Sequence, residues 1–131
     1  MKKSVQTFFA PELIIPNGIK DIDFYKKAFG AIELRRFSND DGSIHVSEMT
    51  IDGALFHLHE VMPKPGLFDP ARHSGTTAII GLMVEDAKTM MQKAIEAGAK
   101  EVSPMQDYDY GYRQGQVIDP HGHRWMIEQV L

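Results

Sequence analysis

One pattern occurs twice along the chain, and this internal repeat limits the possible folds more than any other feature. In the first half, residues 26–34 read KKAFGAIEL and residues 50–61 read TIDGALFHLHEV. In the second half, the matching stretches are QKAIEAGAKEV at 92–102 and VIDPHGHRWMIEQV at 117–130. A unit of this size leaves one apolar sheet face uncovered, so the two copies must pack into a joint structure.

Each half predicts the same order of elements: a strand, a helix and three further strands. Apolar residues at helical spacing before Gly30 indicate the first helix, and Asp86 as N-cap with Gly98 as stop indicates the second. Helices are expected near 18–31 and 86–99, and strands near 8–16, 31–38, 43–51, 54–61, 76–85, 100–106, 109–118 and 123–131. The sequence therefore predicts an α+β fold of two tandem βαβββ modules, about 4–62 and 76–131. A linker rich in glycine and proline joins them near 63–75, and the whole chain forms one domain.

The clearest local signal is a β-hairpin with a two-residue turn at Asp52-Gly53. This turn pairs Glu48 with His57 and Val46 with His59. Because side chains alternate along a strand, Phe56 should face the helices while Glu48, His57 and His59 face the opposite side of the sheet.

Composition excludes several classes of protein. The chain has 131 residues, a net charge of −4 and no long basic run, which argues against a nucleic-acid surface. It has no cysteine, hence no disulfide, no thiolate nucleophile and no cysteine zinc site. No apolar run is long enough to span a membrane. The start resembles a signal peptide, but Pro11, Glu12 and Pro16 interrupt it, so we expect a cytoplasmic protein.

The repeated modules, IDFYKKAFGA at 22–31 and GQVIDPHGHRW at 115–125 resemble the vicinal oxygen chelate superfamily. This superfamily includes glyoxalase I, extradiol dioxygenases and the fosfomycin- and bleomycin-resistance proteins, and the chain is most similar to its PhnB-like branch. The resemblance implies a curled mixed sheet around a concave cavity, with the helices on the convex side.

The metal enzymes of that superfamily place one ligand at each of four strand positions. Carried over, these positions are Ala10, His57, Ile79 and Met126, so three of the four offer no ligand for a divalent metal ion. We therefore expect no metal at this position and no cofactor, although a divalent metal held in another way stays open.

Candidate ligand-binding residues come from both halves. Glu48, His57 and His59 are expected in the cavity, together with Met83, Arg124, Met126 and Glu128, and Tyr110 is a candidate for an aromatic rim. Two alternatives stay open: the charged groups could simply satisfy one another, and the tyrosines could serve strand-edge or dimer packing. His121 and His123 flank Gly122 in a turn and are interpreted as structural.

These observations predict a small-molecule-binding protein that forms a homodimer and lacks the usual metal site. The alternative is an enzyme of lyase, isomerase or dioxygenase type. It would use Glu48 and His57 as acid and base, or a non-standard metal site built from Glu48, His57, His59 and Glu128.

Overall fold

The computed structural model describes residue 4 and residues 6–131, so the first residues of the signal-like stretch lie outside the described residues. Its first module contains β1 (Glu12–Ile15), α1 (Asp23–Phe29), β2 (Ile32–Ser38), β3 (Ile44–Ile51) and β4 (Ala54–Glu60). A short 3-10 helix, η1 (Pro70–His73), follows in the connecting segment. The second module contains β5 (Ile79–Met83), α2 (Ala87–Glu96), β6 (Lys100–Tyr108), β7 (Tyr112–Ile118) and β8 (Arg124–Val130).

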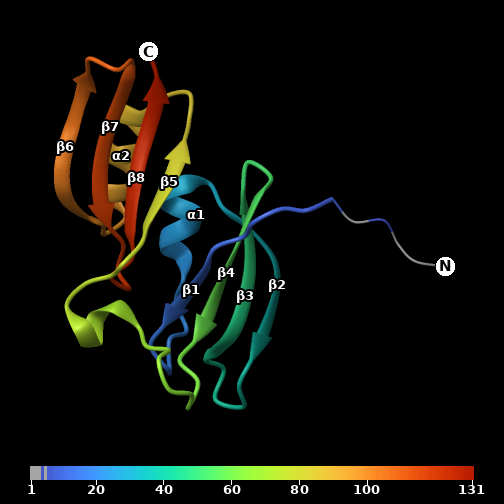
Figure 1. Ribbon diagram of the computed structural model, residues 1–131. Coiled ribbons are helices and arrows are strands. Elements are labelled where there is room, and N and C mark those ends of the chain that lie inside the picture. The colour runs from blue at the N-terminus through green and yellow to red at the C-terminus, as the bar shows by residue number, and fades with distance from the viewer. Residues whose placement is uncertain (1–3, 5) are drawn as a thin grey trace.

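The strands form two separate four-stranded sheets with the same topology, β1-β4-β3-β2 and β5-β8-β7-β6. In each sheet the first strand of the module runs parallel to the last, and the remaining neighbours are antiparallel. Figure 1 shows α1 between the two sheets, and α1 also packs against α2. The α+β class and the two tandem βαβββ modules are thus confirmed, with two sheets in place of one continuous curled sheet.

The predicted hairpin register is confirmed. Glu48 pairs with His57 and Val46 with His59 across β3 and β4. Asp52 and Gly53 both have positive φ, 48° and 83°, as a type I′ turn requires.

The first strand is shorter than the sequence predicts. Residues 8–11 lie outside β1, and Phe9 is almost fully exposed. Pro11 accepts a hydrogen bond from His57 N at 2.9 Å, but a proline has no N–H to donate, so regular pairing begins only at Glu12.

The end of α1 and the start of α2 follow from local chemistry. Gly30 ends α1 in the left-handed conformation at φ 67°, where other residues are strained. The Asp86 side chain caps α2 as predicted, because its carboxylate accepts from Thr89 N at 3.1 Å. None of the helices in the described part of the chain is long and apolar enough to cross a membrane.

The main core lies between the two sheets. The Phe56 ring packs on Tyr25 of α1 at 5.6 Å between centroids, as the predicted register requires. Trp125 of β8 is 1% exposed and contacts both Phe29 at 4.7 Å and Phe56 at 5.8 Å. Aromatic rings from both modules thus meet around α1, and each sheet keeps one face free of helices.

Candidate functional site

The helix-free face of the first sheet carries the predicted histidines. His57 lies between Glu12 on parallel β1 and Glu48 on antiparallel β3, each directly opposite it in register. Its Nδ1 is 3.7 Å from Glu12 Oε1. Sequence analysis missed Glu12, because only the parallel β1–β4 register brings it to His57 and no turn fixes that register locally.

Glu48 is not bonded to the histidines. Its carboxylate accepts two hydrogen bonds from Arg35, from Nε at 3.0 Å and from Nη2 at 3.1 Å. These hydrogen bonds hold the pKa of Glu48 below its ordinary value. Glu48 is therefore a fixed anion, which makes it a poor proton acceptor at neutral pH.

His59 is oriented by the backbone. Its Nδ1 lies 2.7 Å from the Glu60 carbonyl oxygen, which can only accept, so the proton sits on Nδ1 and Nε2 stays free. The ring lines a cleft of about 310 Å³ at the end of this face. The other lining residues are Glu12, Ile14, Glu60, Met62, Lys64 and Leu67.

The helix-free face of the second sheet carries two polar pairs between β7 and β8. Arg124 Nη1 donates to Gln116 Oε1 at 3.1 Å, and Gln114 Nε2 donates to Glu128 Oε1 at 2.8 Å. The Tyr110 hydroxyl donates to Gln114 Oε1, which brings this candidate rim residue to the same cluster. Arg124 and Glu128 are thus each hydrogen-bonded to a glutamine and do not pair with each other.

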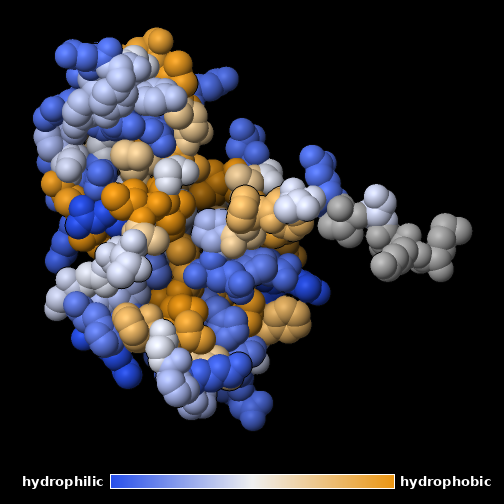
Figure 2. Space-filling view, in the orientation of Figure 1, coloured by the Kyte–Doolittle hydropathy of each residue, from blue (hydrophilic) through white to orange (hydrophobic). Residues whose placement is uncertain are grey.

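Apolar side chains surround these polar pairs. Ile79 and Met83 of β5 are 52% and 49% exposed on the same face, and Met126 lies opposite Gly81. On the first sheet, Ile32 and Phe37 of β2 are similarly exposed. Figure 2 shows a band of hydrophobic residues reaching the surface through the middle of the molecule.

One chain does not bring the two sets of candidates together. Glu48, His57 and His59 lie on the first sheet, whereas Arg124, Met126 and Glu128 lie on the second. Within residue 4 and residues 6–131, no three His, Cys, Asp or Glu side chains are grouped so that they could hold a metal ion. A metal site joining Glu128 to Glu48, His57 and His59 is therefore not formed within a single chain. Of the carried-over positions, Ala10 precedes β1 and Ile79 pairs with Arg124.

The DPHGHRW stretch, residues 119–125 of the second module, forms hydrogen bonds with the first module. Asp119 is 3% exposed, and its Oδ2 accepts from Tyr25 Oη at 2.8 Å and from Trp125 Nε1 at 3.0 Å. Its Oδ1 accepts from the backbone N–H groups of His121 and His123. His123 Nε2 is 2.7 Å from the Ile14 carbonyl oxygen, and the His121 ring stacks on Tyr25. Both histidines are buried parts of this turn and lie on neither helix-free face.

Two βαβββ modules with helix-free sheet faces define a class of paired-module α+β proteins, and comparison with known proteins identifies the family. The model of the Glyoxalase/Bleomycin resistance protein/Dioxygenase superfamily matches residues 12–127. The chain therefore belongs to this superfamily.

Individual relatives agree with this assignment. The uncharacterized protein Rv0887c of Mycobacterium tuberculosis is 34% identical over 134 residues, covering 100% of this chain and 79% of its own. The X-ray structure of the Arabidopsis thaliana gene product At5g48480 is 31% identical with a TM-score of 0.72, covering 97% of this chain and 100% of its own. TioX from Micromonospora sp. ML1 is 22% identical with a TM-score of 0.68, covering 95% and 97% of the two chains, and shows the fold alone.

Proposed function

We propose that this protein binds a small organic molecule between the helix-free sheet faces of two copies, in the cytoplasm and without a metal at the usual superfamily position. The observation that carries the proposal is the composition of those faces. They combine exposed apolar side chains with a few polar groups whose positions are fixed by hydrogen bonds, as small-molecule sites do.

A second copy is needed because each face is open in the single chain. Ile32 and Phe37 on the first sheet and Ile79 and Met83 on the second are all about half exposed or more, and exposed apolar surface of this kind is usually covered by a partner. A two-fold dimer would use the same surface of both copies, so one pair of faces could cover another. His57 and His59 of one copy would then line the cavity together with Arg124 and Glu128 of the other.

Association is tested with two single substitutions to aspartate, one on the open sheet face and one on the exposed surface of α2. We expect light scattering to give a dimer for the wild type and for Ile95→Asp, whose side chain is exposed on α2. Met83→Asp should give a monomer, because a carboxylate in a covered apolar contact loses its hydration. A wild-type monomer at micromolar concentration would contradict the dimer.

Binding is tested by native mass spectrometry of the purified protein. We expect a small molecule to remain bound to the dimer and to be lost in Arg124→Ala, which removes a cation from the polar pairs on the second face. The matched control is Arg36→Ala, because Arg36 pairs with Glu33. A wild-type dimer of bare mass, together with failure to retain any member of a library of small aromatic and carboxylic compounds, would contradict the binding proposal.

An enzymatic role is the second candidate, and the Glu12–His57 contact favours it. A carboxylate beside one imidazole nitrogen orients the ring, so His57 could act as a general base on a bound substrate. Glu48 is the weaker candidate, since Arg35 binds both of its carboxylate oxygens. A lyase or isomerase turnover abolished by His57→Gln and reduced by Glu12→Gln would establish this function.

A further inference from the structure

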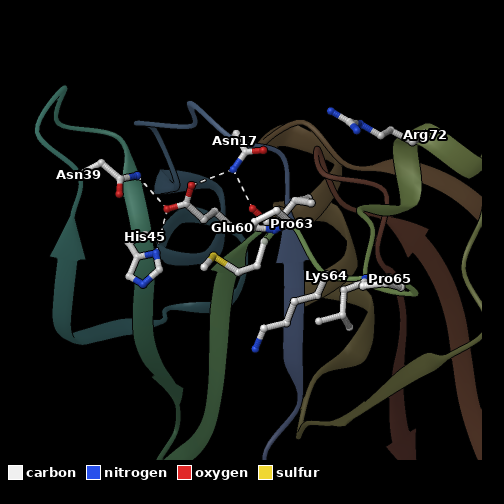
Figure 3. Close-up of a pocket in the computed structure, with 11 residues that line it drawn as sticks. Asn17, Asn39, His45, Glu60, Pro63, Lys64, Pro65 and Arg72 are labelled. Atoms are coloured by element: carbon white, nitrogen blue, oxygen red, sulfur yellow. Dashed lines mark hydrogen bonds and ion pairs between the residues drawn. The ribbon is translucent and has the colours of Figure 1, made fainter.

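A larger cleft, of about 770 Å³, lies at the end of the first sheet, beside the segment that joins the modules. Figure 3 shows its two sides: Asn17, Asn39 and His45 converge on Glu60, and Lys64, Pro65 and Arg72 come from the connecting segment. The cleft is distinct from the polar pairs on the second sheet, but it adjoins the smaller cleft beside His59, because Glu60, Met62, Lys64 and Leu67 line both. The His45 ring lies 5.2 Å from the ring of His59.

Glu60 is the fixed anion of this cleft. Its Oε1 accepts from Asn17 Nδ2 at 2.8 Å, and its Oε2 accepts from Asn39 Nδ2 at 2.8 Å. His45 Nδ1 lies 2.9 Å from the same Oε2. The hydrogen bond from Asn39, followed by that from His45, lowers the pKa of Glu60 below its ordinary value.

This network fixes the chemistry of His45. A carboxylate only accepts hydrogen bonds, so His45 Nδ1 carries a proton and Nε2 of the neutral ring is left as a hydrogen-bond acceptor. Three donors already satisfy Glu60, so it has little capacity left to attract a cation into the cleft. A ligand anion would therefore have to be held by cations from the opposite wall.

The opposite wall supplies two such cations. Arg72 Nε is 3.5 Å from Asp69 Oδ1, and the Arg72 side chain is 69% exposed, so its terminal nitrogens remain accessible. Lys64 has no ion-pair partner within 4 Å in the described part of the chain. Met62 and Leu67 add an apolar surface to the lining of the same cleft.

We propose that this cleft is a second ligand site, which binds a small organic anion. Its carboxylate or phosphate group would lie by Lys64 and Arg72, and its apolar body would pack on Met62 and Leu67. Charge-assisted hydrogen bonds to a guanidinium are short and directional, and the apolar surface favours an anion with a hydrocarbon part over an inorganic ion.

The test is a titration followed by NMR, with benzoate and phenyl phosphate as probes and benzamide as the neutral analogue of the same shape. We expect saturable shifts in the His45 imidazole and in the amides of residues 61–72. One or both of the anions should bind at least about tenfold more tightly than benzamide, which corresponds to about 1.4 kcal/mol. The order of the two anions distinguishes a carboxylate site from a phosphate site.

The double variant Lys64→Gln/Arg72→Gln should weaken binding of the preferred anion at least about tenfold, while Lys88→Gln on α2 leaves it unchanged. His57→Gln should also leave it unchanged, which separates this cleft from the site proposed on the sheet faces. The proposal is overturned if neither anion shifts these resonances, if benzamide binds equally well, or if the double variant binds as tightly as the wild type.

Discussion

Asp119 is expected to be the most sensitive polar residue of the fold, and Asp119→Asn tests this. Its two carboxylate oxygens accept four hydrogen bonds inside the core, from the Tyr25 hydroxyl, the Trp125 indole and the N–H groups of His121 and His123. Burial, followed by the charge of Asp119, raises the pKa of Tyr25 well above its ordinary value of 10.0, so the tyrosine remains a donor at neutral pH.

The magnitude follows from which hydrogen bonds an amide can keep. If the Asn oxygen retains the two backbone N–H groups, its NH₂ group faces Tyr25 and Trp125. The Tyr25 hydroxyl can rotate and accept, but the Trp125 indole N–H can only donate and is left unsatisfied. An unsatisfied buried donor costs about 1–3 kcal/mol, and the remaining bonds lose their charge assistance, so we expect a loss of about 3 kcal/mol. Tyr25→Phe leaves three donors on Asp119 and should lower the free energy of unfolding by about half as much as Asp119→Asn does.

Urea denaturation followed by fluorescence measures this loss directly, because Trp125 is the single tryptophan of the chain and lies in the cluster. With a slope of about 1.5 kcal/mol per M, the midpoint should fall by roughly 2 M. The protein concentration is held fixed, since association would change the midpoint. Asp109→Asn, in the exposed turn after β6, is the matched control and should leave the midpoint unchanged. A midpoint within about 0.3 M of wild type for Asp119→Asn would refute the assigned role.

Three further predictions concern the turn, the pH and the metal content. Gly18→Ala should lower the free energy of unfolding by about 1 kcal/mol, from its positive φ alone. Gly122→Ala should lower it clearly more, because the added Cβ would lie 2.9 Å from Pro70 Cβ. Equal melting temperatures for the two variants would contradict this. Burial lowers the pKa of His121 below 6.5, so the unfolded chain binds more protons and stability should fall as the pH drops below that value. His121→Asn should flatten this dependence, and an unchanged slope in pH-dependent unfolding would count against it. Elemental analysis should find no stoichiometric zinc, nickel, iron or manganese. About one ion per chain, lost in His57→Ala, would contradict the metal-free proposal and favour the enzymatic function.

Local chemistry made much of the fold readable from the sequence. A two-residue turn fixes a hairpin register by itself, so Asp52-Gly53 was enough to place Phe56 toward the helices and His57 on the other face. Asp86 and Gly30 act within one turn of their helices, and the repeat required two modules of the same topology. Each of these features depends on residues close together in the chain.

The contacts that define the candidate sites depend on residues far apart in the chain. Glu12 reaches His57 only through the parallel β1–β4 pairing, and Tyr25 reaches Asp119 only when α1 packs between the sheets. Arg35 forms an ion pair with Glu48, and Gln116 accepts a hydrogen bond from Arg124; the sequence left both partners open. The sequence by itself determined the modules and the facing of their side chains, because turns, caps and alternation are local. Only the tertiary structure decided which charged groups meet, since the pairing of distant strands and the packing of α1 between the two sheets bring them together.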